Sequence, residues 1–164
     1  MGLIINKSIQ KMMVGYPTVS DKYNVAGGLL TGANAVQFGD LVKTSGTAGY
    51  FEKASSIAAV EDIAGFVLAT NVKLAEGFPG TVIQVNPGEA FNLLINGFIA
   101  VQLDAGATLE KATPNAKVYV ILETGKLTTS DKAEDSKVVE LPGCVFTGIT
   151  ETQGTAIVAE IFVK

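Results

Sequence analysis

The sequence predicts an all-β protein: a β-barrel or sandwich of short antiparallel strands with an extended N-terminal arm. Gly, Thr and Val recur at short intervals along the chain, which contains 18 Gly, and this spacing is typical of short strands separated by turns. Few helix-forming residues keep a helical period, so no long amphipathic helix is expected. With 164 residues, 48% of them hydrophobic, the chain is long enough for one compact core.

The N-terminal region has a different pattern from the rest and is expected to form the arm. We place the arm at residues 1–35 and a single β-barrel domain at residues 36–164. An apolar set is spaced loosely along one face of the arm, and Gly15-Tyr16-Pro17 follows it. The set consists of Ile4, Ile5, Ile9, Met12, Met13 and Val14. Because so apolar an arm is unstable alone in water, it should lie on its own barrel or on a neighbour.

Nine strands are expected after the arm, each rich in β-branched or aromatic residues and ended by turn residues. Gly46 and Gly49 predict one hairpin and Gly125 a second, whereas residues 130–136 are expected to form a solvated loop. The expected strands are Val36–Thr44, Tyr50–Lys53, Gly65–Thr70, Thr81–Val85, Ala90–Asn96, Phe98–Leu103, Lys117–Leu122, Val145–Thr150 and Ala156–Val163.

The two parts of the barrel sequence resemble each other. Residues 40–44 and 50–53, around a Gly turn, match residues 117–121 and 126–128. Residues 63–68 then match 141–146, and 81–85 match 155–159. This predicts two related half-barrels or sheets around one core, with Pro87–Leu103 as a central hairpin between them. The alternative is that any Gly-rich β protein shows such similarities by chance.

The composition favours a structural or binding role over catalysis. The chain has no His, Trp or Arg and one Cys, so it lacks the commonest general base and metal ligand. We therefore expect no enzyme activity, no cofactor and no metal. The net charge of −4 and the scattered Lys residues argue against nucleic acid as a partner. The longest apolar stretch, 90–103, is too short and too polar for a membrane span.

A few side chains could still support chemistry, and each has a simpler explanation. Ser8 and Lys11 have the Ser-x-x-Lys spacing of some acyl-transfer enzymes, but the further motifs of those enzymes are absent. Cys144 has no His to activate it and is expected to be a buried core thiol. Carboxylate pairs that could serve a hydrolase or bind Ca²⁺ are most simply solvated surface groups; they are Glu61 with Asp62, and Asp104 with Glu110.

Three segments resemble the tailed-phage structural cement proteins, also called capsid decoration proteins. They are residues 10–17 (QKMMVGYP), 36–42 (VQFGDLV) and 63–67 (IAGFV). In that family an arm with a Gly-Tyr-Pro-Gly element leads into a β-barrel that contains a Pro-Gly-Glu turn, here residues 87–89. Thr18 stands where the family usually has Gly after the Pro, so the resemblance does not define the conformation of that turn.

The resemblance implies a homotrimer on the exterior of a virion head, made in the host cytoplasm, that clamps neighbouring subunits of the major capsid protein. The expected residues for capsid or inter-subunit contact are Ile9, Met12, Met13, Tyr16 and Pro17; alternatively these cover the protein's own barrel. The high hydrophobic fraction independently favours self-association. Two other functions stay open: a β-rich adhesion or fibre module that binds a glycan or receptor, and a small carboxylate-based hydrolase.

Overall fold

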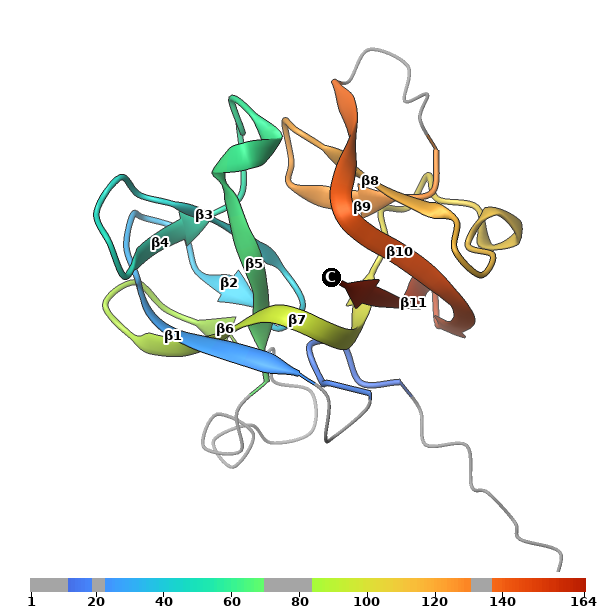
Figure 1. Cartoon of the computed structure of the whole chain (residues 1–164), viewed down its shortest axis with the longest axis horizontal. Helices are drawn as coiled ribbons and strands as arrows, with labels where there is room; N and C mark the ends of the chain where they lie inside the picture. The colour runs from blue at the N-terminus through green and yellow to red at the C-terminus, as the bar shows by residue number, and fades with distance from the viewer. Residues whose placement is uncertain (1–11, 19–22, 70–83, 131–136) are drawn as a thin grey trace, which may run out of the picture.

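The computed structural model describes residues 12–18, 23–69, 84–130 and 137–164, and it is all-β, which confirms the predicted fold class (Figure 1). The only helical elements in these four ranges are two single 3₁₀ turns, η1 (Val60–Asp62) and η2 (Leu109–Lys111). The strands are β1 (Asn24–Leu30), β2 (Val36–Gln37), β3 (Leu41–Thr44), β4 (Tyr50–Lys53), β5 (Ile63–Leu68), β6 (Gln84–Val85), β7 (Ala90–Gln102), β8 (Lys117–Ile121), β9 (Lys126–Thr128), β10 (Val138–Gln153) and β11 (Ala156–Val163).

Nine of these strands form one sheet in the order β1-β4-β3-β5-β7-β11-β10-β8-β9. Its first part closes on itself, because β1 pairs with β4 on one side and with the N-terminal part of β7 on the other. This closed barrel of five strands is the first ring. The short strands β2 and β6 form a separate two-stranded sheet.

The second part of the sheet forms a second ring that shares β7 with the first. The C-terminal part of β7 pairs with β11, and β10, β8 and β9 follow. A parallel bridge from Leu127 to Leu103 then leads back to the end of β7. Figure 1 shows the two rings side by side, with β1 to β6 on the left and β8 to β11 on the right.

The two rings have the same connections, in agreement with the interpretation as two related halves. In each, a hairpin (β3–β4 or β8–β9) is followed by a strand that pairs with the first strand of that hairpin (β5 or β10). Residues 81–83 of the expected match of 81–85 with 155–159 lie outside the described residues, and residues 84–85 pair with β2 instead. The strand that corresponds to β11 is the N-terminal part of β7, since it pairs with β5 as β11 pairs with β10.

The predicted central hairpin is also wrong, because residues 90–102 form one continuous strand. Asn96-Gly97 is a dipeptide typical of hairpin turns, but such a turn needs positive φ at both positions. Only Gly97, with φ of 130°, has it. A continuous β7 can pair with β1 and β5 at one end and with β11 at the other, so it gives more cross-strand hydrogen bonds than a local turn.

Three other boundaries differ from the expectation. Residues 24–30, within the range 1–35 expected as an arm, form β1 of the first ring. The expected strand 36–44 is divided into β2 and β3 by a turn in which Gly39 has φ of 83°. Strand β10 begins at Val138 and continues through Pro142, so it is longer than expected. Each difference reflects pairing with a strand that is distant in the sequence.

The buried apolar residues form two clusters. The smaller fills the first ring and includes Val42, Val67 and Leu93. The larger fills the second ring and also takes Phe66 and Leu94 from the opposite face of the first-ring strands. Neighbouring residues on β5 and β7 therefore serve different clusters, because successive side chains of a strand point to opposite faces. The larger cluster joins the two rings into one packed body.

Candidate contact surface around the N-terminal segment

Residues 12–18, which contain most of the predicted contact residues, lie on the protein's own body. The N–H of Gly15 donates to the carbonyl of Ala100 at 2.8 Å, and the N–H of Ala100 donates to the carbonyl of Tyr16 at 3.2 Å. The N–H of Thr18 donates to the carbonyl of Phe98, also at 3.2 Å. The segment is therefore a short antiparallel partner of the C-terminal part of β7.

Gly15 allows this segment to fit between β7 and the first ring. Its carbonyl accepts a hydrogen bond of 2.8 Å from the N–H of Ala69, just after β5. Its φ is 81°, and a Cβ at this position would lie 2.3 Å from the Cβ of Phe38. A Cβ on Gly39 would in turn lie 2.6 Å from Cγ1 of Val14. Only glycine at both positions permits so close an approach of the two backbones.

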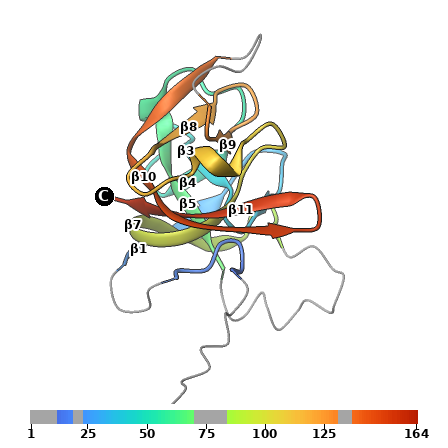
Figure 2. The same ribbon diagram turned by 90° about the vertical axis from the view of Figure 1, so that its right-hand side faces the viewer.

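The end of the β10–β11 hairpin holds Met12. The carboxylate of Glu151 accepts a hydrogen bond from the N–H of Met12 at 2.9 Å, and the side-chain amide of Gln153 donates to its carbonyl at 2.6 Å. The turned view in Figure 2 shows the segment beneath β11 and this hairpin. The backbone of Met12 is thus fixed by side chains more than a hundred residues away in the sequence.

The predicted contact residues differ in how far they are exposed. Met13 is 54% exposed, while Met12, Tyr16 and Pro17 are half-buried against the body. Burial raises the pKa of the Tyr16 hydroxyl. Ile9 lies outside the described residues. Met13 is therefore the member of this set that the described segment presents most openly to a partner.

Sequence reasoning missed a second group of exposed apolar side chains, at the start of β1. Tyr23 is 40%, Val25 42% and Ile95 48% exposed. The pairing between the strands brings them together, since Val25 faces Leu94 across the ladder and a register shift follows at Asn24. No periodic pattern in the sequence could reveal this group, because the pairing joins residues some seventy positions apart.

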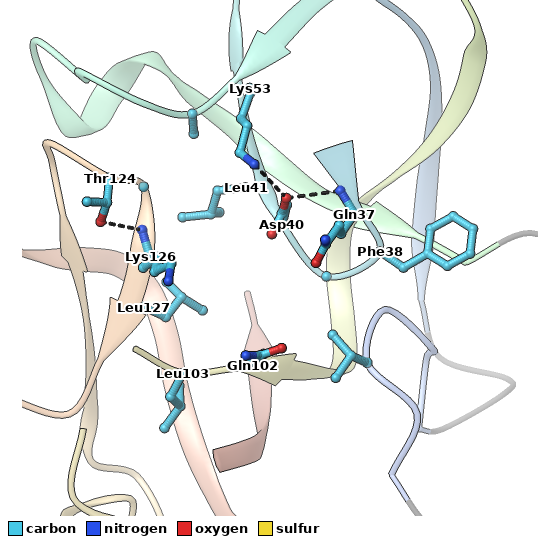
Figure 3. A pocket seen from close by; sticks show the side chains of 14 residues that line it. Gln37, Phe38, Asp40, Leu41, Lys53, Gln102, Leu103, Thr124, Lys126 and Leu127 are labelled. Carbon is cyan, nitrogen blue, oxygen red and sulfur yellow. Dashed lines mark hydrogen bonds and ion pairs between the residues drawn. The ribbon is translucent and has the colours of Figure 1, made fainter. Parts of the chain in front are cut away.

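A cleft of about 290 Å³ lies between the two rings (Figure 3). Among the described residues that line it, Asp40 is the only acidic one. The carboxylate of Asp40 lies 3.5 Å from the ammonium of Lys53 and accepts the N–H of Gln37 at 3.0 Å. Lys126 contributes a further cation from the second ring. A glycoside hydrolase uses two carboxylates, and the described lining contains one, which is already paired with Lys53.

The other residues considered for chemistry have structural roles or lie elsewhere. Cys144 is buried, as expected, and desolvation raises the pKa of its thiol to about 12, so the thiolate needed of a nucleophile is disfavoured. Asp62 and Asp104 each accept a backbone N–H within their own turns. Ser8 and Lys11 lie outside the described residues.

The described part of the chain contains no group of three or more Cys, Asp or Glu residues that could hold a metal ion. The same ranges contain no helix with the length and apolarity needed to cross a membrane.

Two comparisons with known proteins, one with family models and one with solved structures, agree with each other. The family model described as structural cement protein (E217 gp24/Pam3 gp6) matches residues 5–160. Among solved structures, a chain of the capsid of Myoviridae phage XM1 is similar with a TM-score of 0.66 and 15% sequence identity. That alignment covers 97% of this chain and 95% of the other, and at this identity it shows a shared fold. A search of the curated proteins finds no match.

Proposed function

Since this chain belongs to the structural cement protein family, whose model matches residues 5–160, we propose that it decorates the exterior of a phage head and clamps neighbouring subunits of the major capsid protein. In this proposal it acts as a homotrimer, is made in the host cytoplasm and has no enzymatic activity. The family match over most of the chain is the observation that carries the proposal. The fold shared with a phage capsid chain supports it.

The surface chemistry suits adhesion. Decoration requires apolar and backbone contacts over a broad surface rather than a group with a tuned pKa. Met13 offers an exposed, flexible apolar side chain on a backbone that β7 and the β10–β11 hairpin hold in place. A fixed backbone lowers the entropy lost on binding. We propose that the segment containing Ile9, Met12, Met13, Tyr16 and Pro17 contacts the capsid or a neighbouring copy.

Binding to expanded phage heads that lack the protein tests this function. Purified protein should co-sediment with the heads and raise the temperature at which they release DNA. Met13→Ser should weaken binding about tenfold, whereas Leu109→Ser, at an exposed apolar residue on η2, should bind as the unaltered chain does. Heads that gain neither bound protein nor heat resistance would contradict the function. Unchanged binding by Met13→Ser would contradict the role of Met13 alone.

A further inference from the structure

The two rings differ at one strand edge. β1 in the first ring corresponds to the C-terminal part of β7 in the second: each is antiparallel to the last strand of its ring, with Val25 facing Leu94 and Ile99 facing Ile161. The C-terminal end of each of these two strands also makes a parallel contact with the second strand of the hairpin in its own ring. β1 makes this contact with β4, and Leu103 makes it with Leu127.

In the second ring the corresponding edge of β7 is covered. Gly15, Tyr16 and Thr18 pair with Ala100 and Phe98 along that edge. In the first ring, β1 pairs with β7 along Asn24–Leu29 and reaches β4 only from Leu29 onward. Within the described ranges, residues 24–28 therefore have a strand neighbour on one side only. Figure 1 shows β1 at the margin of the first ring, with β7 on its inner side.

This edge lacks the charged and proline residues that usually prevent pairing with another chain; its one irregularity is the register shift between Asn24 and Val25. Residues 24–28 (NVAGG) contain no Lys, no Pro and no other charged residue, although charges and Pro are common protections of edge strands. Asn24, Val25 and Gly27 are exposed, and a Cβ on Gly27 would meet no atom within 4 Å. Tyr23 and Val25, at the start of this strand, are exposed, and so is Ile95 on the neighbouring β7. An added strand would form hydrogen bonds with the unpaired backbone of this edge and apolar contacts with the exposed side chains.

We propose that residues 1–11 of a second copy of this chain add to the open edge of β1 as an extended strand. The chain's own residues 15–18 already occupy the corresponding edge in the second ring. Leu3, Ile4 and Ile5 suit a strand on a half-buried surface. Lys7 and Lys11 make the segment basic, whereas the whole chain has a net charge of −4, so the segment and the remainder attract each other.

The path of the chain favours a second copy over the chain's own arm. Met12 is hydrogen-bonded to Glu151 and Gln153 on β10. Glu151 faces β11, and β11 in turn pairs with Gln102 at the C-terminal end of β7. The open edge lies beside residues 92–96, about 26 Å back along the strand at 3.3 Å per residue. The chain's own arm would have to reverse direction to cover it. A second copy needs no reversal, and the resulting head-to-tail contact can close into a ring.

Light scattering after size-exclusion chromatography tests this contact in solution, independently of capsid binding. The unaltered chain should be oligomeric. Val25→Lys places a cation on the edge and should raise the dissociation constant at least tenfold, as should deletion of residues 1–11. Val139→Lys, at an exposed apolar residue on β10, is the matched control and should leave the oligomer intact. Thermal unfolding of each variant checks that it is folded.

A mixture of the two defective variants gives the sharper result. The Val25→Lys chain keeps its arm and the truncated chain keeps its edge, so together they should form a one-to-one pair that neither forms alone. A monomeric unaltered chain, an oligomer that survives Val25→Lys, or an oligomer that survives the truncation would each overturn the proposal. So would failure of the two folded variants to pair.

Discussion

At the scale of single residues, glycine decides where the N-terminal segment lies. Gly15 has φ of 81° and touches Phe38 so closely that no Cβ fits. Gly46 has a similar φ of 85°, but nothing lies within 4 Å of its Cβ position. A side chain at Gly46 would cause backbone strain at positive φ only, whereas one at Gly15 would also overlap with a neighbour, so comparing the two positions separates these effects.

Gly15→Ala should destabilise the protein more than Gly46→Ala. Both substitutions put a side chain on a residue with positive φ, and this backbone strain costs about 1–3 kcal/mol. Gly15→Ala must also displace Phe38 or the N-terminal segment itself. Chemical denaturation of both variants measures the difference in the free energy of unfolding. Equal losses would mean that the close approach of Gly15 to Phe38 contributes nothing.

At the scale of elements, the β10–β11 hairpin has two functions. It completes the second ring, and its end holds residues 12–18 through the side chains of Glu151 and Gln153. Strand pairing to β7 holds the same segment from the other side. The segment is thus part of the folded body as far as Met12, and this orders the exposed Met13.

Gln153→Ala should loosen this segment while the barrel stays folded. Loss of the hydrogen bond to Met12 should cost about 1 kcal/mol, or roughly fivefold in the opening equilibrium. Hydrogen exchange at the N–H of Gly15, which is bonded to Ala100, should therefore speed up by about that factor. Thr152→Ala, at an exposed neighbouring residue, should leave this exchange unchanged; equal acceleration in both variants would contradict the role of Gln153.

At the scale of the whole molecule, the larger apolar cluster makes the two rings one folding unit. Phe66, on β5 of the first ring, is 1% exposed and lies in the same cluster as Cys144, on β10 of the second. Loss of packing in one ring should therefore lower the stability of the other. Cys144 provides a natural probe, because its thiol is buried in the folded state.

Phe66→Ala should expose Cys144 at a lower denaturant concentration. Truncation of a buried Phe costs about 3–5 kcal/mol, and in a cooperative molecule the whole of that loss appears in the unfolding of both rings. Thiol labelling across a denaturant series measures the exposure of Cys144, and circular dichroism follows the sheet as a whole. An unchanged labelling midpoint would mean that the second ring unfolds independently of the first.

The sequence predicted correctly those elements that depend on neighbouring residues in the chain, and it missed those that depend on distant ones. The predicted strands 50–53 and 156–163 coincide with β4 and β11, because β-branched and aromatic residues between turn signals define them. The burial of Cys144 followed from its apolar neighbours. Strand β1 was assigned to the arm, since its Gly-Gly pair weakens any strand pattern. Whether residues 12–18 lie on the barrel or on a neighbour could not be chosen from sequence.

The sequence by itself determined the all-β class, the repeated hairpins and the absence of a His- or Arg-based site, since these depend on composition and local spacing. Only the tertiary structure decided that β7 runs unbroken through both rings, that residues 15–18 cover one of its edges, and that the corresponding edge of β1 has no such cover within the described residues. The physical reason is that strand pairing joins residues far apart in the chain, and its energy depends on the partner rather than on the local sequence.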